Sequence, residues 1–176
     1  MPGINIHLAA AEEYLKLHPL ERRNDFILGS IAPDLTDTNE THHPLPGFET
    51  NAYTFLVGKV NLKECLPDFD ISTSFGKGYF FHLITDYEFY TGMAVGKEDL
   101  YRNTDYREFK AKLYHDYESF NDLLKEKYDI KFPEAVKEWN ISSSDAPLII
   151  DINYVEKLIS RLAHVDLLQY KNSVEQ

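Results

Sequence analysis

The 176-residue sequence contains a single cysteine, Cys65. One cysteine cannot form a disulfide within the chain, and it excludes a zinc cage built from several thiolates. No stretch approaches the roughly 18 apolar residues that a membrane span requires. The first residues, MPGINIHLAAAEEY, lack the basic region and apolar run that mark a signal peptide. We therefore expect a cytoplasmic protein without a transmembrane segment.

Positive charge is also scarce. The chain has 18 lysines and arginines against 29 aspartates and glutamates, a net charge of −11. Nucleic-acid binding requires basic side chains that replace the counterions of the phosphate backbone, and anionic membranes attract polybasic segments. The charge balance therefore argues against both nucleic acid and an anionic membrane surface as partners.

Strand patterns are few, and only APLIID at 146–151 is ambiguous. Apolar residues recur instead at helical spacing almost throughout. We predict helices over 4–17, 22–30, 50–61, 75–91, 104–128, 133–139 and 151–169, with loops over 33–47, 62–74 and 142–144. These elements predict an all-α fold, a single-domain multi-helix bundle over residues 1–176.

Polar residues interrupt this pattern at four positions where an apolar side chain is expected: His7, His82, Asp86 and Asp116. His82 and Asp86 are four residues apart within GKGYFFHLITDYEFY, so they lie on one helix face. A buried carboxylate requires a cation, a metal ion or strong donors. Lysine and arginine are missing from the neighbouring inward positions of these helices, which favours a metal ion. The alternative for the pair is a His–Asp hydrogen bond within the core.

The loop at 33–47 supplies further metal-binding side chains. Asp34 follows the end of a predicted helix, and His42 and His43 lie on irregular backbone, where functional residues are common. Any of them could instead be an ordinary surface residue. Together with the helical positions they offer carboxylates and imidazoles from separate segments. Such ligands without sulfur suit Zn²⁺, and also Fe²⁺, Mn²⁺ or Ni²⁺.

The order and context of these residues resemble the zinc-dependent phospholipase C family. The motifs are a histidine early in the first helix, FILGSIAPD at 26–34, the dipeptide TH at 41–42 and GYFFHLITD at 78–86. The resemblance covers about residues 1–90. It implies an all-helical fold of the phospholipase C and P1 nuclease type. It also implies hydrolysis of a small phosphoester or a phospholipid headgroup with a cluster of zinc ions.

The resemblance also implies roles for individual residues. Asp34, His42, His82 and Asp86 match the ligands of one zinc ion, and His7 matches a ligand of a second ion that Asp86 bridges. His42 is preferred to His43 because the matching histidine of the family follows a threonine. Apart from the resemblance, Asp34 is the expected general base, because a carboxylate that touches both metal and water can accept a proton. Asp116 matches an aspartate of short bacterial relatives, and a ligand role and a hydrogen bond to a buried tyrosine are equally open for it.

The chain departs from the family at the third zinc site. Gly92 stands where a histidine is expected, six residues after Asp86, and no HxxxE motif occurs. The start of the chain also lacks the tryptophan that completes a site in the secreted phospholipases. We therefore expect one or two ions rather than three.

Two other functions compete with a metal-dependent phosphoesterase. The dipeptide His115-Asp116 suggests an HD-type phosphohydrolase, but helical phase turns His115 away from the inward face that Asp116 occupies. The missing third-site ligands suggest a non-catalytic helical scaffold with a structural or vestigial metal. We expect His18, His115 and His164 to be surface residues. By helix phase, Tyr79 and Tyr90 could either line the site or belong to the core.

Overall fold

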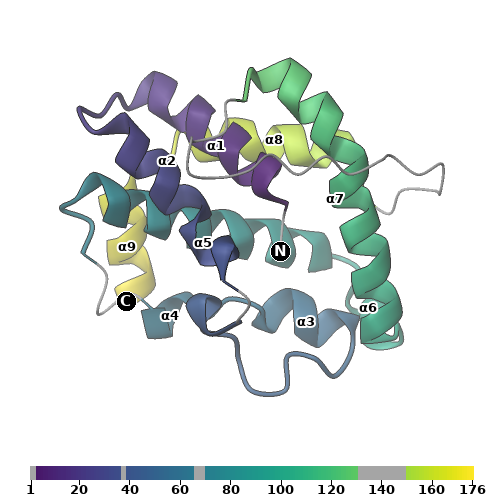
Figure 1. Cartoon of the computed structure of the whole chain (residues 1–176). Coiled ribbons are helices and arrows are strands. Elements are labelled where there is room, and N and C mark those ends of the chain that lie inside the picture. Colours follow the sequence, from purple (N-terminus) through teal and green to yellow (C-terminus); the bar gives the residue numbers. More distant parts are fainter. Residues whose placement is uncertain (1–2, 37–38, 66–69, 131–149) are drawn as a thin grey trace.

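The computed structural model describes residues 3–36, 39–65, 70–130 and 150–176 (Figure 1). These residues contain helices and no strand, which confirms the predicted all-α class. The elements are α1 (Ile4–Leu17), α2 (Arg23–Ile31), η1 (Ala32–Leu35), η2 (Asn39–His42), α3 (Ala52–Gly58), α4 (Leu62–Cys65), α5 (Ser74–Ala94), α6 (Glu98–Arg102), α7 (Tyr106–Tyr128), α8 (Ile152–Ala163) and α9 (Leu167–Glu175), where η marks a 3-10 helix. None of these helices is long and apolar enough to cross a membrane.

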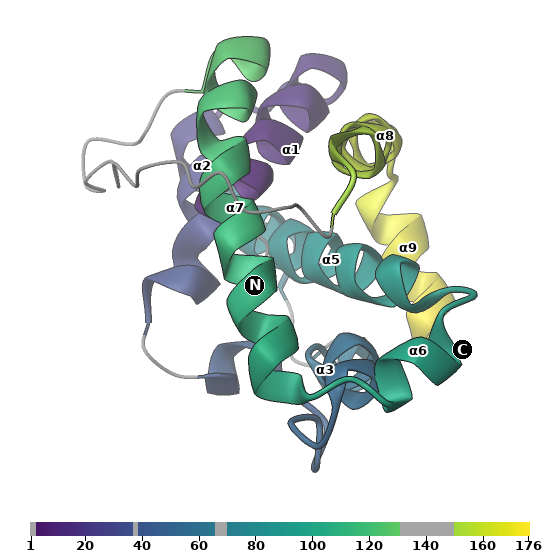
Figure 2. The ribbon, with the colours of Figure 1, turned by 90° about the vertical axis from the view of Figure 1, so that its right-hand side faces the viewer.

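Helix α5 lies at the centre of the fold. Helices α1 and α2 pack on one side of it and α3 and α4 on another, while α7 packs against both α1 and α3 (Figures 1 and 2). The seven consecutive residues 80–86 are therefore 0% exposed. A helix that is buried on all sides is normally apolar all round, so His82 and Asp86 on α5 demand a specific partner.

The closest helix contact is the crossing of α2 and α5, where two glycines face the opposite backbone. A Cβ atom built on Gly29 would lie 2.2 Å from the Phe75 carbonyl oxygen, and one built on Gly78 would lie 2.1 Å from the Phe26 carbonyl oxygen. Both separations are too short for any side chain. Glycine at these positions lets the two backbones touch, and this contact positions α2 against the middle of α5.

Several helix boundaries differ from the predictions. Helix α3 starts at Ala52 because Asn51 forms a reciprocal capping box with Thr54, and it ends at Gly58 rather than near residue 61. The predicted loop over 62–74 contains the one-turn helix α4, and α6 was not predicted. The predicted helix 151–169 is two helices, because Asp166 caps a new helix through a bond from the Gln169 N–H. The predicted helix 133–139, the loop 142–144 and most of APLIID lie outside the described residues.

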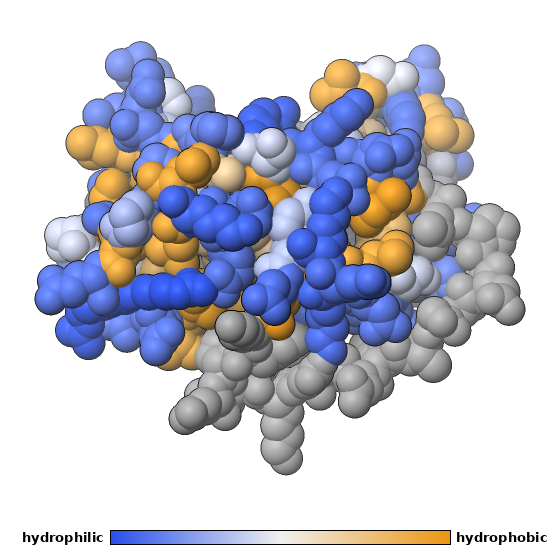
Figure 3. All heavy atoms as spheres, turned by 90° about the horizontal axis from the view of Figure 1, so that it is seen from above, coloured by the Kyte–Doolittle hydropathy of each residue, from blue (hydrophilic) through white to orange (hydrophobic). Residues whose placement is uncertain are grey.

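Helix α4 buries Cys65, whose thiol donates a 3.1 Å hydrogen bond to the Asn61 carbonyl. Phe75, in the first turn of α5, is 46% exposed. The face seen from above in Figure 3 shows separate apolar patches among hydrophilic side chains.

Candidate metal centre

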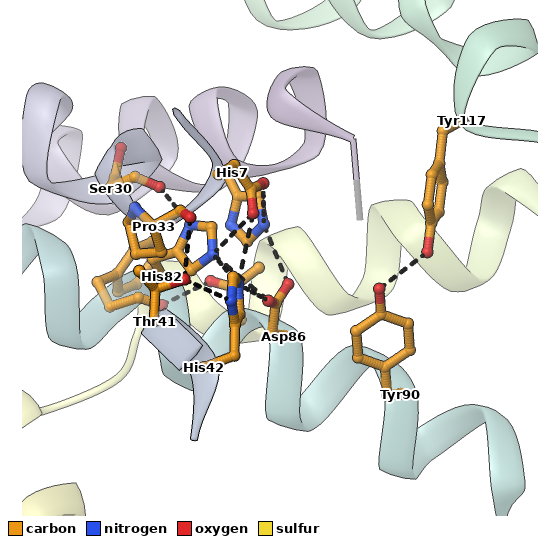
Figure 4. Close-up of polar contacts among 12 residues, drawn as sticks. His7, Ser30, Pro33, Thr41, His42, His82, Asp86, Tyr90 and Tyr117 are labelled. Atoms are coloured by element: carbon orange, nitrogen blue, oxygen red, sulfur yellow. Dashed lines mark hydrogen bonds and ion pairs between the residues drawn. The ribbon is translucent and has the colours of Figure 1, made fainter. Parts of the chain in front are cut away.

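Five of the six predicted metal ligands meet beside α5. His7 comes from α1, His42 from η2, and His82 and Asp86 from α5 itself (Figure 4). Asp34 comes from η1. Their side chains are each at most 1% exposed. His43, the rejected alternative to His42, is exposed and has a left-handed backbone with φ of 49°.

Four donor atoms are close enough to surround one ion. His42 Nε2 lies 3.0 Å from both His82 Nε2 and Asp86 Oδ2, and His82 Nε2 lies 3.3 Å from Asp86 Oδ2. Asp34 Oδ1 is 3.4 Å from both of these nitrogens. Two ligands about 2.1 Å from one zinc ion are about 3.0 Å apart at a right angle and about 3.4 Å apart at the tetrahedral angle. The observed separations match the coordination shell of a small divalent ion.

The remaining carboxylate oxygens face the other way, toward His7. His7 Nε2 lies 3.0 Å from Asp86 Oδ1 and 3.6 Å from Asp34 Oδ2. Donor atoms of His7, Asp34, His82 and Asp86 all lie within 4.8 Å of one another. The two aspartates thus divide their oxygens between two positions, as carboxylates that bridge two ions do. One position has four protein donor atoms, and the position beside His7 has three.

Hydrogen bonds fix the orientation of two of the imidazoles. His82 Nδ1 lies 2.7 Å from the Ser30 carbonyl oxygen and donates to it. The Thr41 hydroxyl donates to the Pro33 carbonyl at 3.1 Å, so it accepts from His42 Nδ1 at 3.0 Å. Both rings therefore direct an Nε2 lone pair at the other ring across 3.0 Å. Two lone pairs at this distance repel unless a proton or a metal ion lies between them. Hydrogen bonds that hold Nδ1 in this way are typical of metal-binding histidines.

The other polar atoms of the cluster lack hydrogen bonds. All four oxygens of Asp34 and Asp86 and both ring nitrogens of His7 are buried and make no hydrogen bond to any described residue. The imidazole nitrogens and carboxylate oxygens of the cluster lie 3.0–3.6 Å from one another. Buried polar atoms without partners are costly, so convergence on a common point favours a bound ion.

Charge supports the same conclusion. Without metal, burial opposes protonation of His82, but the charges of Asp34 and Asp86 outweigh burial and raise its pKa to about 10. Burial also opposes ionisation of the two aspartates, yet His82 holds the pKa of each well below its usual range. Burial, and then His82, lower the pKa of His7. A single proton on His82 balances only one of the two aspartate charges and leaves a buried net negative charge. One divalent ion balances both carboxylates.

Asp116 is not part of this cluster. Its side chain is 0% exposed, its Oδ2 accepts a 2.8 Å hydrogen bond from the Ile150 N–H, and its Oδ1 is 3.4 Å from His115 Nδ1. Asp116 therefore anchors the chain before α8 to α7, so its contacts support the structural alternative. The His115-Asp116 pair lies apart from the five converging residues, which removes support from an HD-type site.

The three histidines that were expected at the surface differ in their exposure to solvent. His164 is exposed as predicted, but the side chain of His115 is only 20% exposed, so that expectation was wrong. His18 is half-buried because its ring stacks on Tyr14 at 4.3 Å and its Nε2 bonds to the Ala163 carbonyl at 3.1 Å. None of the three lies in the cluster.

The space beside Gly92, the position where the related family has a third-site histidine, is occupied by the side chain of Tyr154. A Cβ atom built on Gly92 would lie 2.5 Å from the hydroxyl oxygen of Tyr154 on α8. That hydroxyl donates a 2.5 Å hydrogen bond to the Phe89 carbonyl. A histidine at position 92 would displace Tyr154.

The sequence did not decide whether Tyr79 and Tyr90 line the site or belong to the core, and the two side chains have different surroundings. The Tyr79 hydroxyl donates to the Thr41 carbonyl at 3.2 Å, so it supports the segment that carries His42. Tyr90 is 1% exposed, and its hydroxyl accepts from Tyr117 of α7 at 3.3 Å (Figure 4). Both are packed residues of the fold.

Sequence reasoning missed Lys59, which directly follows α3 and is 3% exposed. Its ammonium lies 5.5 Å from the ring centroid of Phe48 and 5.9 Å from that of Phe55. Burial lowers its pKa, and the charges of Asp86 and Asp34 oppose that shift. The spacing from Phe55 to Lys59, one helical turn, placed the lysine on an apolar stripe and was the available signal.

Comparisons of the chain with protein-family models, with curated proteins and with solved structures found no match. The chain's chemistry must therefore be inferred from its own residues.

Proposed function

We propose that this protein is a metal-dependent phosphoesterase, of the kind that its motifs resemble, with one or two zinc ions bound by His7, Asp34, His42, His82 and Asp86. The supporting observation is the division of the aspartate oxygens between His42 and His82 on one side and His7 on the other. Such a pair of adjacent positions suits ions that clamp the oxygens of a phosphoryl group.

The two positions have different roles in this proposal. The position with four protein donor atoms has a complete tetrahedral set, as in structural sites, whereas the position beside His7 has three donor atoms, so water would be the fourth ligand of an ion there. Zinc bound there would supply positive charge for the phosphoryl oxygens and acidify the bound water. Asp34 is the proposed general base. Its Oδ2 lies 3.6 Å from His7 Nε2, beside the position where the water would bind.

The test is turnover of metal-loaded protein on p-nitrophenyl phosphate and on bis(p-nitrophenyl) phosphate, with Zn²⁺, Mn²⁺, Fe²⁺ or Ni²⁺. At zinc content matched to that of the wild type, we expect Asp34→Asn to lose turnover by about 10²- to 10⁴-fold, the usual contribution of a general base. Asp122→Asn, at an exposed position of α7, is the matched control and should keep full activity.

A structural ion in a helical scaffold is the second candidate, because all five side chains are at most 1% exposed. Metal bound at full occupancy without turnover of either ester would support the scaffold and contradict the phosphoesterase.

A further inference from the structure

Two of the five proposed ligands lie on short turns rather than on long helices. Asp34 is in η1 and His42 is in η2, and each of these 3-10 helices has four residues. A single 3-10 turn has poor backbone hydrogen-bond geometry and cannot by itself hold a side chain in one orientation. His7 and His82, in contrast, belong to α-helices of 14 and 21 residues. The positions of Asp34 and His42 therefore depend on contacts outside their own turns.

The hydroxyl of Thr41 joins these two turns. Its Oγ1 lies 3.1 Å from the carbonyl oxygen of Pro33, the residue before Asp34, and 3.0 Å from Nδ1 of the next residue, His42. A hydroxyl has one proton to donate and two lone pairs that accept, whereas a carbonyl oxygen only accepts. Thr41 therefore donates to Pro33 and accepts the Nδ1 proton of His42. One hydroxyl thus connects a ligand in η2 to the residue that precedes a ligand in η1.

The backbone on both sides of His42 is fixed to other segments. The Tyr79 hydroxyl donates to the Thr41 carbonyl at 3.2 Å, and Tyr79 belongs to α5, which also carries two of the ligands. After His42, the Asn61 N–H donates to the His43 carbonyl at 3.2 Å. These two bonds hold the backbone of η2 in place. They do not fix the rotation of the His42 ring, so the ring orientation depends on the Thr41 hydroxyl.

The tautomer of His42 follows from the same contact. With the proton on Nδ1, the Nε2 lone pair faces His82 Nε2 and Asp86 Oδ2, each at 3.0 Å. A neutral imidazole with its proton on Nε2 could bind metal only through Nδ1, which faces the Thr41 hydroxyl instead. The group that holds one ring nitrogen therefore decides which nitrogen is available to a metal ion.

We propose that Thr41 is a positioning residue of the metal centre: its hydroxyl keeps the His42 proton on Nδ1 and links the turns that carry His42 and Asp34. This inference rests on the metal binding in the proposed function and not on the phosphoesterase reaction. Thr41 is not itself a ligand, and it acts through His42. Thr36 offers a matched comparison, since its hydroxyl donates to the same Pro33 carbonyl at 3.3 Å but makes no hydrogen bond to any of the five proposed ligands.

The test compares the zinc affinity of Thr41→Val, Thr41→Ser and Thr36→Val in competition with a chelating dye, after circular dichroism has verified that each variant is folded. We expect Thr41→Val to weaken zinc binding about 10- to 100-fold, the usual effect of removing a group that orients a metal-binding histidine. Thr41→Ser keeps the hydroxyl and should bind zinc nearly as the wild type does. Thr36→Val should bind zinc normally, because the contact with His42 remains.

Nuclear magnetic resonance of the zinc-loaded wild type tests the tautomer without any substitution. Long-range proton–nitrogen correlation spectra should show that the His42 ring carries its proton on Nδ1, held by a hydrogen bond and therefore in slow exchange with water. A proton on Nε2 of His42 would overturn the proposal, even if Thr41→Val failed to fold.

The outcomes separate this inference from the proposed function. Equal zinc affinity in the wild type and Thr41→Val would overturn the role of Thr41 and leave the phosphoesterase intact. If Thr36→Val or Thr41→Ser lost as much affinity as Thr41→Val, the bond between Thr41 and His42 would not be the cause, which also overturns that role. A zinc-loaded wild type that turns over no ester would refute the phosphoesterase alone, and a wild type that binds no zinc would refute both.

Discussion

Replacing Gly78 with alanine should lower both the stability of the fold and the affinity for metal, although Gly78 is not one of the proposed metal ligands. The added Cβ would lie 2.1 Å from the Phe26 carbonyl oxygen and 3.0 Å from the Ser30 amide nitrogen. The obstacle is helix backbone, which cannot rotate away as a side chain can. To bring the first contact to an acceptable length, α2 and α5 must separate by about 1 Å.

The magnitude follows from two opposing effects. Overpacking typically costs about 1–3 kcal/mol, and backbone contact places this site near the upper end. Alanine in place of glycine returns about 1 kcal/mol through helix propensity. The net loss of about 2 kcal/mol should lower Tm by about 4–8 °C in a chain of this size. The same displacement stretches the 2.7 Å bond from His82 to the Ser30 carbonyl beyond hydrogen-bond length, so metal affinity should fall about 10- to 100-fold.

Thermal unfolding with and without Zn²⁺, together with competition against a chelating dye, measures both effects. Lys77→Ala is the neighbouring control on α5, and it should change stability by less than about 0.5 kcal/mol. If Gly78→Ala unfolds at the wild-type temperature and binds zinc equally well, the close crossing does not position His82, and the reasoning fails.

Three further predictions concern the cluster and its surroundings. His7→Ala should lower zinc content by one ion if two bind, whereas Asp86→Asn should remove both; elemental analysis that shows equal loss would exclude Asp86 as the bridge. Asp116→Ala should cost about 1–3 kcal/mol in chemical denaturation, because the Ile150 N–H loses its acceptor, and it should leave zinc content unchanged. Without metal, the folded state holds a proton on His82, whose pKa is about 10 against 6.5 in the unfolded chain. That stabilisation is complete below pH 6.5 and is lost as pH rises toward 10, so Tm measured with a chelator should fall between pH 7 and 9. Zn²⁺ should abolish this fall because it replaces the proton; a flat profile without metal would refute the protonated cluster.

The sequence predicted the long helices well because their apolar residues repeat over many turns. Helix α5 was expected over 75–91 and spans Ser74–Ala94, and α7 was expected over 104–128 and spans Tyr106–Tyr128. Helices of one turn, such as α4, show no repeat and were missed. The break before α9 depends on one capping side chain, Asp166, within an otherwise continuous helical pattern.

The candidate site was predictable where a polar residue interrupts an apolar stripe. That signal found His82 and Asp86, and motif order added Asp34 and His42. It could not separate a ligand from an anchoring side chain, since Asp116 is as buried as Asp86 but bonds to backbone instead. Periodicity shows that a residue points inward, but the partner that it meets depends on the tertiary packing.

The lone thiol bears on how this protein responds to oxidants. Burial raises the pKa of Cys65 to about 12, so almost none of it is thiolate at neutral pH, and its hydrogen is donated to the Asn61 carbonyl. Reaction with peroxide or alkylating reagents requires the thiolate. The metal-binding side chains proposed here contain only nitrogen and oxygen donors. Iodoacetamide or mild peroxide should therefore leave zinc binding by these side chains unchanged.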